Sequence, residues 1–319
     1  MGGPEGFRTL LREIVLAVGM ISILVVALWA HTGSMPPLVV VESNSMQHDP
    51  TGEIGTIDAG DLVLVHSPEK RSVITFADAS NPDSINYGHE SLGMAGDVII
   101  FERNGEKDST PIIHRALFEI RIETSVEAVE SRCTEGTFWM DICILTWTVP
   151  GTNQVNVDKI NILFDGNDAG KYRCGGIAAQ HGKTWFTVEN YTPSNPGFIT
   201  LGDNNDCNDD QSVFEFAQGL SSIHSGIIRP VEDRWVIGIS GAELPWLGTV
   251  KLFVSGGSSP GISQVPGSSF MFLVMVVGGI IAIPMLVDPL FTRVLKNSPE
   301  IVEANKEDLN SKIYSSEEE

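Results

Sequence analysis

The segment Val39-Val40-Val41-Glu42-Ser43-Asn44-Ser45-Met46-Gln47-His48-Asp49-Pro50 joins an apolar run to a cluster of turn residues. Branched apolar residues favour a pleated, buried strand, whereas Ser, Asn, Asp and Pro favour a turn. The segment therefore predicts a strand that ends at two serines. A hydroxyl at a strand end can be held beside a base, which a nucleophilic serine needs. An ordinary strand end with polar turn residues is the alternative interpretation.

The composition limits the classes of function that the chain can perform. It has 319 residues, of which 42% are hydrophobic, so one large domain or two ordinary ones can form a sizeable core. The net charge of −21 argues against a nucleic-acid partner, because phosphate binding needs Lys and Arg. Four cysteines allow several disulfide pairings, among which the sequence does not choose: Cys133, Cys143, Cys174 and Cys207.

Two uncharged apolar runs, residues 14–30 and 270–287, are each long enough to cross a bilayer as a helix. A cleaved signal peptide is the alternative for the first run, and a buried core helix is the alternative for the second. Basic residues precede the first run and follow the second, which predicts that both ends are cytoplasmic. These basic residues are Arg8, Arg12, Arg293 and Lys296.

The resulting prediction is a multi-pass protein of the cell membrane whose main domain is extracytoplasmic. Its parts are a cytoplasmic N-terminus (1–13), a transmembrane helix (14–30), an extracytoplasmic domain (31–254), a flexible Gly/Ser/Pro linker (255–269), a second transmembrane helix (270–287) and an acidic cytoplasmic tail (288–319).

The region between the apolar runs predicts a mainly β fold, because short apolar or alternating runs there follow turn residues. The predicted strands are 61–65, 97–101, 112–122, 184–188, 197–201, 235–239 and 250–254. No long amphipathic helix is evident between the runs. Residues 119–195, rich in Asn, Gly, Asp and Cys, predict an inserted β subdomain.

Three polar pieces, far apart in sequence, could form one site: residues 43–46, 112–115 and 201–210. A serine protease needs a nucleophile, a base and usually a carboxylate that orients the base. Histidine titrates near neutral pH, so His114 can accept a proton. Each piece alone also has a simpler explanation, such as a structural histidine or a turn. The stretch 203–210 lacks the Gly and the terminal Glu of an EF-hand calcium loop, so no metal or cofactor is predicted.

Together, and in this order, the pieces resemble the type I signal peptidases of the archaeal and endoplasmic-reticulum kind. The resemblance leaves most of residues 119–195 unmatched and rests on these motifs: Ser43-Asn44-Ser45-Met46, Gly96-Asp97-Val98-Ile99-Ile100-Phe101, Ile113-His114-Arg115, Gly202-Asp203-Asn204-Asn205 with Asp209, Arg229-Pro230-Val231, Trp235-Val236-Ile237-Gly238 and Leu244-Pro245-Trp246-Leu247-Gly248. It implies an antiparallel β catalytic core at the membrane surface. The implied reaction is hydrolysis of the bond after the signal peptide of an exported preprotein, with small residues at the first and third positions before the cut.

The resemblance also implies a role for each site residue. Ser45 is the implied nucleophile, and His114 is the implied general base, where the bacterial branch has a lysine. Asp209 is implied to orient His114, with Asp203 supporting the site, although the residues leave open which of the two carboxylates lies closer to His114. The Ser43 hydroxyl and the Ser45 backbone N–H are the implied oxyanion donors.

One departure from the family concerns the loop after the nucleophile. The family usually has Pro two residues after the Met, but Gln47 and His48 follow Met46 here. His48 is therefore a rival base. His114 is the preferred one, because a side chain only three residues from Ser45 rarely reaches back in line with its hydroxyl.

Two other functions remain alternatives. A Ser/Lys protease lacks a lysine beside His114, since Lys107 lies in an apparent turn. A membrane-tethered, non-catalytic β domain that binds a partner or a cell-wall component would use no nucleophile.

The expected partners follow from the position of the nucleophile. The chain from Ala30 to Ser45 spans at most about 50 Å, which keeps Ser45 near the bilayer. The strand at 39–41 could pair with an extended substrate. The expected partners are signal peptides of secretory and membrane preproteins and the lipid bilayer, with the Sec translocation machinery as a further candidate.

Overall fold

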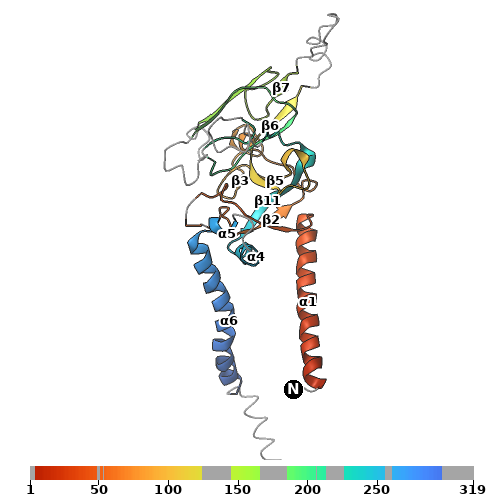
Figure 1. Ribbon diagram of the computed structural model, residues 1–319, viewed down its shortest axis with the longest axis vertical. Coiled ribbons are helices and arrows are strands. Elements are labelled where there is room, and N and C mark those ends of the chain that lie inside the picture. The colour runs from red at the N-terminus through yellow and green to blue at the C-terminus, as the bar shows by residue number, and fades with distance from the viewer. Residues whose placement is uncertain are drawn as a thin grey trace, which may run out of the picture. The chain divides into compact units, whose positions relative to one another are not determined.

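A computed structural model describes residues 4–48, 51–52, 54–123, 145–165, 185–205, 207–212, 226–255 and 261–296 (Figure 1). The chain divides into two compact units, Met1–Ser269 and Phe270–Glu319. All of the described β structure belongs to the first unit.

Long helices occur near both ends of the described chain. Helix α1 (Pro4–Thr32) contains the predicted run 14–30, and its stretch Leu11–Thr32 is long and apolar enough to cross a membrane. Helix α6 (Gly267–Lys296) contains the predicted run 270–287. Among the described residues α1 is the one helix that passes this test, because the apolar stretch found in α6, Gly267–Ile280, is shorter.

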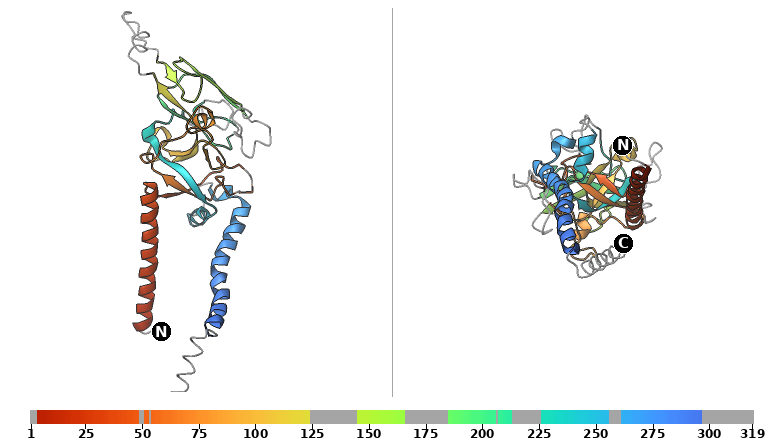
Figure 2. Two further views of the ribbon diagram at one scale, coloured as in Figure 1. Left: turned by 180° about the vertical axis from the view of Figure 1, so that it is seen from behind. Right: turned by 90° about the horizontal axis from the view of Figure 1, so that it is seen from below.

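The central sheet has seven antiparallel strands: β1 (Leu38–Val40), β2 (Leu62–His66), β5 (Val98–Phe101), β6 (Ile112–Ile122), β7 (Trp147–Thr148), β10 (Gly197–Leu201) and β11 (Val236–Leu244). Their order is β1-β2-β11-β5-β6-β10, and β7 pairs with β6. Figure 2 shows the same strands from behind and from below. Two small antiparallel pairs join β3 (Glu90–Ser91) to β4 (Met94–Ala95) and β8 (Ile160–Asp165) to β9 (Trp185–Tyr191). The prediction of a mainly antiparallel β fold is confirmed.

One predicted strand, 250–254, is wrong. These residues belong to helix α4 (Gly248–Val254). Thr249 and Leu252 are buried while Phe253 is exposed, and burial of two residues three apart is a helical spacing. Packing of one helix face therefore outweighs the strand preference of the β-branched residues. The remaining short helices are α2 (Phe76–Ser80), α5 (Gly261–Gln264), η1 (Arg103–Gly105) and η3 (Asp233–Trp235).

The predicted inserted β subdomain packs against the central sheet where the structure describes it. Its expected boundary at residue 119 falls inside β6. Leu117 and Phe118 of β6 share one hydrophobic cluster with Trp147, Ile160 and Val188, which come from the predicted insertion. Residues 124–144 and 166–184, with three of the four cysteines, lie outside the described residues. Cys207 is disulfide-bonded.

Strand β6 positions the residues of the candidate site. It lies between β5 and β10, with His114 opposite Ile99 of β5 and Arg115 opposite Leu201 of β10. Successive side chains of a strand point to opposite faces, so His114 and Arg115 reach different surroundings from one backbone segment.

Gly96 lies in the turn before β5, where the start of helix α2 packs closely against it. Its φ is +78°, and a Cβ there would lie 2.5 Å from the backbone nitrogen of Phe76. Gly88 has nearly the same φ, +79°, but a Cβ there would meet nothing within 4 Å. Both Ala variants bear the left-handed backbone cost of about 1–2 kcal/mol, and Gly96→Ala adds a clash with backbone. Gly96→Ala should therefore lower the melting temperature more than Gly88→Ala, and equal losses would contradict this packing.

Candidate active site

Three side chains from separate segments form a hydrogen-bonded chain. Ser45 lies in the turn after β1, His114 is in β6, and Asp210 follows β10. His114 Nε2 lies 2.9 Å from Ser45 Oγ, and His114 Nδ1 lies 2.6 Å from Asp210 Oδ2. His114 is 2% exposed and Asp210 is fully buried. This is the relative order of nucleophile, base and orienting carboxylate in a serine hydrolase.

The carboxylate that contacts His114 is Asp210, which corrects the sequence-based choice of Asp209. The backbone N–H of Asp210 donates to the carbonyl of Thr200 at 2.9 Å, which fixes Asp210 beside β10. The Thr200 hydroxyl also donates to Asp210 Oδ2, at 2.6 Å. Asp209 instead turns into its own loop, where its Oδ1 accepts the backbone N–H groups of Gln211 and Ser212.

Asp209 is a buried carboxyl outside the hydrogen-bonded chain of Ser45, His114 and Asp210. Burial raises its pKa to about 6, and the nearby charge of Asp210 acts in the same direction, while the hydrogen bonds from Ser212 and Gln211 oppose the rise. Its Oδ2 is buried and has no hydrogen-bond partner among the described residues. Asp209 is therefore mostly ionised at neutral pH, although it lies next to the carboxylate of Asp210 that contacts His114.

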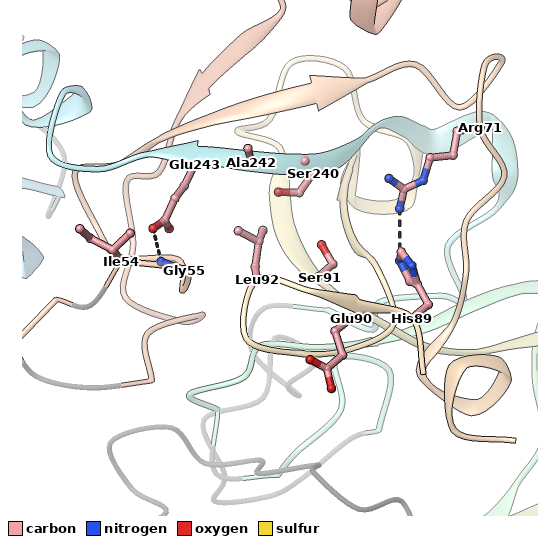
Figure 3. Close-up of a pocket in the computed structure, with 11 residues that line it drawn as sticks. Ile54, Gly55, Arg71, His89, Glu90, Ser91, Leu92, Ser240, Ala242 and Glu243 are labelled. Carbon is pink, nitrogen blue, oxygen red and sulfur yellow. Dashed lines mark hydrogen bonds between the residues drawn. The ribbon is translucent and has the colours of Figure 1, made fainter. Parts of the chain in front are cut away.

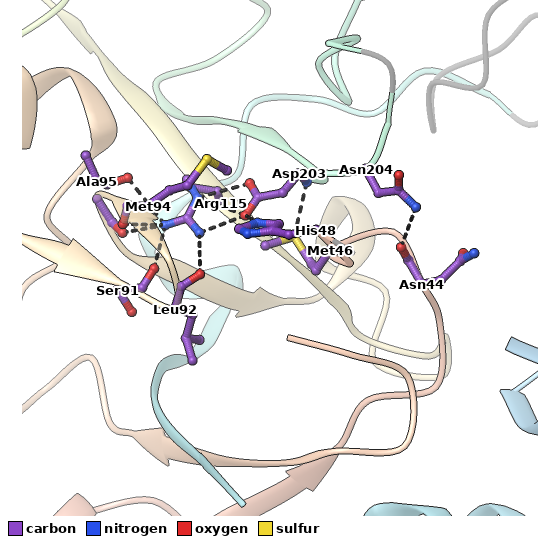
Figure 4. A network of polar contacts seen from close by, with 11 residues as sticks. Asn44, Met46, His48, Ser91, Leu92, Met94, Ala95, Arg115, Asp203 and Asn204 are labelled. Atoms are coloured by element: carbon purple, nitrogen blue, oxygen red, sulfur yellow. Dashed lines mark hydrogen bonds and ion pairs between the residues drawn. The ribbon is translucent and has the colours of Figure 1, made fainter. Parts of the chain in front are cut away.

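Asp203 forms a buried ion pair with Arg115, the residue after His114. Arg115 Nη2 donates to Asp203 Oδ2 at 2.7 Å and Arg115 Nε donates to Asp203 Oδ1 at 3.0 Å, with both side chains fully buried. His48 Nε2 also lies 2.9 Å from Asp203 Oδ2 (Figure 4). Burial raises the pKa of Asp203, but the charge of Arg115 and the contact with His48 outweigh it, so the pKa lies below its ordinary value.

His48, the rival base, is thus held by Asp203, and the contact to the Ser45 hydroxyl comes from His114. Asp203 supports the site through Arg115 and His48. Its role differs from that of Asp210, whose carboxylate contacts His114 directly.

The same arginine ties the β3–β4 hairpin to the site. Arg115 Nη1 donates to the backbone carbonyls of Ser91, Met94 and Gly96 at 3.0, 3.2 and 2.7 Å (Figure 4). A guanidinium presents several donors in a fixed plane, so one side chain can satisfy several carbonyls at once. Nothing in the sequence motif Ile113-His114-Arg115 indicates these partners, because they depend on tertiary contact.

The Gly202–Asn205 turn holds the loop that carries Ser45 in place. The backbone N–H of Asn204 donates to the carbonyl of Ser45 at 2.8 Å, and the Asn204 side chain donates to the carbonyl of Asn44 at 2.9 Å. A Cβ on Gly202 would lie 2.7 Å from His114 Nε2, so the turn can approach the base only with glycine here. Ser43 Oγ lies 3.2 Å from Ser45 Oγ, which places the predicted oxyanion hydroxyl beside the nucleophile.

Residues 261–269 of the predicted linker 255–269 form helix α5 and the start of α6 and contact the segment around Ser45. Gln264 Oε1 accepts the backbone N–H of Asn44 at 3.0 Å, and the Ser268 hydroxyl donates to the carbonyl of Thr51. Val265 and Ser269 are buried. The Gly, Ser and Pro composition does not indicate these contacts, because a contact between residues 220 positions apart leaves no local sequence pattern.

Within the ranges that the structure describes, no group of three or more His, Cys, Asp or Glu side chains could hold a metal ion. The 2.9 Å contact between Ser45 Oγ and His114 Nε2 allows a proton to pass from the Ser45 hydroxyl to His114.

No protein-family model matches the chain, and no curated protein is significantly similar to it. The geometry of the site and the short motifs are therefore the basis for assigning a function.

The two adjacent aspartates allow a direct test of which carboxylate orients His114. Asp210→Asn should lower the rate of acylation by a serine-directed fluorophosphonate probe by about 10⁴-fold, because the His114 tautomer is no longer held. Asp209→Asn should retain most of the rate, since Asp209 contacts backbone N–H groups instead. The opposite ranking of the two variants would show that the assignment of Asp210 is wrong.

The raised pKa of Asp209 predicts a pH dependence of stability. Its pKa rises from 3.8 to about 6 on folding, so the folded state binds this proton more tightly than the unfolded state. The stabilising contribution is present below pH 3.8 and is lost as the pH rises through about 6. Asp209→Asn should therefore raise the melting temperature relative to the parent more at pH 8 than at pH 5. A difference that is independent of pH would contradict the raised pKa.

Proposed function

We propose that the chain is a membrane-bound serine endopeptidase that removes N-terminal signal peptides from exported preproteins. The observation that carries the proposal is the pair of hydrogen bonds from His114, to Ser45 at 2.9 Å and to Asp210 at 2.6 Å. The motifs around Ser45, His114 and Asp203, which resemble those of type I signal peptidases, supply the substrate class.

The geometry supports a mechanism with two covalent steps. His114 takes the proton of the Ser45 hydroxyl through Nε2 while Ser45 Oγ attacks the carbonyl carbon of the scissile bond. The Asp210 carboxylate accepts a hydrogen bond from Nδ1–H and stabilises the imidazolium that forms. His114 then gives the proton to the leaving amine, which departs as the new N-terminus. Water, deprotonated by His114, then attacks the carbonyl carbon of the ester. His114 returns the proton to Ser45 Oγ as the ester bond breaks, which releases the signal peptide and restores the serine.

Ser43 fits the role of an oxyanion donor. Its hydroxyl lies 3.2 Å from Ser45 Oγ, so it is close to the position where negative charge develops on the attacked carbonyl. The backbone N–H of Ser45 is the second proposed donor. Loss of one such donor typically lowers the rate by about 10²–10³-fold.

The proposed membrane attachment uses both long helices, with α1 and α6 as anchors and both ends cytoplasmic. Helix α1 is tied to the catalytic unit at its end, where Lys70 Nζ donates to the carbonyl of Ala30 at 2.7 Å and Ser67 N–H donates to the carbonyl of Thr32 at 2.9 Å. The catalytic serine follows after a short segment. A cut near the extracytoplasmic face of the bilayer suits substrates whose apolar signal segment lies in the lipid.

Strand β1 offers a surface for the residues before the cut. It is the last strand in the order of the central sheet and pairs on one side with β2. An extended signal-peptide segment can add to such an edge through backbone hydrogen bonds. The proposed partners are therefore signal peptides and the lipid bilayer, with the Sec translocation machinery as the source of the substrates.

Processing of a reporter preprotein by membranes that carry the full chain tests the proposal. Ser45→Ala and His114→Ala should each lower cleavage by at least about 10³-fold, because residues of a triad act as a unit. Ser194→Ala is a matched control on an exposed serine outside the site and should cleave at the parent rate. Cleavage by the Ser45→Ala variant would defeat the proposal. Folded parent protein that never reacts with a serine-directed probe would favour a non-catalytic tethered domain.

A further inference from the structure

A cavity of about 420 Å³ lies between β11 and residues 89–92 (Figure 3). Its lining includes Arg71 and His89 at one end, Glu243 and Gly55 at the other, and Leu92 and Ser240 between them. The lining includes neither Ser45 nor His114. This volume is within the range of about 300–1,000 Å³ that small ligands and peptide side chains occupy in proteins.

Two buried polar atoms of the lining have no hydrogen-bond partner among the described residues. Ser240 is fully buried, and its hydroxyl is unpaired. Glu243 uses Oε1 to accept the backbone N–H of Gly55, while its buried Oε2 is unpaired. Leaving such a group unpaired costs about 1–3 kcal/mol, more when it is charged. Two of them on one cavity indicate a place where a ligand supplies the missing partners.

The charges around the cavity favour a cation at the Glu243 end. Burial raises the pKa of Glu243 to about 7, and the nearby Asp61, also an acid, acts in the same direction. Arg71, at the other end, is already paired with the buried Asp97, which also accepts from His89 at 2.8 Å. Asp97 thus neutralises the positive charge of Arg71. The Glu243 carboxylate, by contrast, would be stabilised by a positively charged group of a ligand.

The strand edge beside the cavity favours an extended peptide as the ligand. Strand β11 pairs with β5 from Val236 to Ile239, whereas its later residues pair with β2 on the other side. Within the described chain, the edge of Ser240–Glu243 that faces the cavity has no paired strand. Backbone hydrogen bonds to such an edge, combined with a pocket for one side chain, are a common mode of peptide recognition.

The cavity also adjoins the nucleophile loop. Leu92 lines the cavity and packs against the hydrophobic cluster that contains Met46, the residue after Ser45. The Gly93 backbone lies against the His48 ring, since a Cβ on Gly93 would be 3.2 Å from it. A peptide in the cavity is therefore close to the loop that carries the nucleophile.

We propose that this cavity, the Glu243 cavity, binds an extended part of the substrate and receives a lysine or arginine side chain against Glu243. The inference rests on the proposed function for the source of the peptide. The residues before the cut are proposed to bind along β1. The Glu243 cavity is therefore assigned to residues of the mature segment, after the cut. The basic group donates to Glu243 Oε2, and the Ser240 hydroxyl pairs with a polar group of the same segment.

Reporter preproteins with Lys, Ala or Glu at each of the first several mature positions test the inference with the full-length enzyme in detergent. At one or two positions the parent should cleave the Lys reporter with a KM about tenfold lower than the Glu reporter, the effect of one charge-assisted hydrogen bond. Glu243→Gln should remove this difference in KM between the Lys and Glu reporters. Glu232→Gln, an acid-to-amide change in the surface pair with Arg234, should keep the preference. A preference that survives Glu243→Gln would overturn the inference.

A binding measurement separates this inference from the proposed function. The amidated tripeptide Ala-Lys-Ala should bind the full-length Ser45→Ala variant in calorimetry at pH 8, and Glu243→Gln in that background should weaken the binding about tenfold. Equal binding by both proteins overturns the cavity assignment, whatever the cleavage assays show. If no variant cleaves a preprotein but the peptide binds as expected, the proposed function fails and the cation site stands.

Ser240→Ala provides a second check on the lining. Because the Ser240 hydroxyl has no partner, its removal should leave the melting temperature unchanged or slightly higher. It should weaken binding of the tripeptide several-fold, since one ligand partner is lost. A marked loss of stability with unchanged peptide binding would show that the hydroxyl serves the fold instead of a ligand.

Discussion

The buried ion pair between Arg115 and Asp203 is the contact on which the rest of the site depends. Both side chains are fully buried, so removal of either partner would leave an uncompensated charge at a cost of about 3–5 kcal/mol. Arg115 follows His114 in β6 and also binds the carbonyls of the β3–β4 hairpin. Asp203 begins the turn that holds the Ser45 carbonyl through Asn204. One pair therefore joins the strand that carries His114 to the loop that carries Ser45.

Each member of the candidate triad is also fixed by backbone structure. Ladder pairing to β5 sets the position of His114, and the hydrogen bond to Thr200 sets that of Asp210. Ser45 is held through its own carbonyl and through the Asn44 N–H, which donates to Gln264. The hydroxyl of Ser45, the imidazole of His114 and the carboxylate of Asp210 lie 2.6–2.9 Å apart because backbone hydrogen bonds fix the segment that carries each side chain.

The sequence predicted the elements that have strong local patterns. The strands at 112–122 and 197–201 were placed at their observed bounds, because apolar residues between turn signals mark a strand. The choice of Asp209 failed by one residue, since a backbone hydrogen bond to Thr200 decides which aspartate faces His114. The strand expected at 250–254 failed because tertiary packing determines that segment. The Glu243 cavity had no sequence signal, as its lining comes from four separated segments.

The contact between Gln264 and Asn44 has a practical consequence for anyone who wishes to shorten the chain before its second apolar helix. Composition alone would suggest trimming the chain at the Gly/Ser/Pro segment, well before the second apolar helix. That cut would discard the Gln264 amide, which accepts the backbone N–H of Asn44 next to Ser45. A shortened protein that ends after Ser269 keeps the hydrogen bond between Asn44 and Gln264, together with the buried Val265 and Ser269.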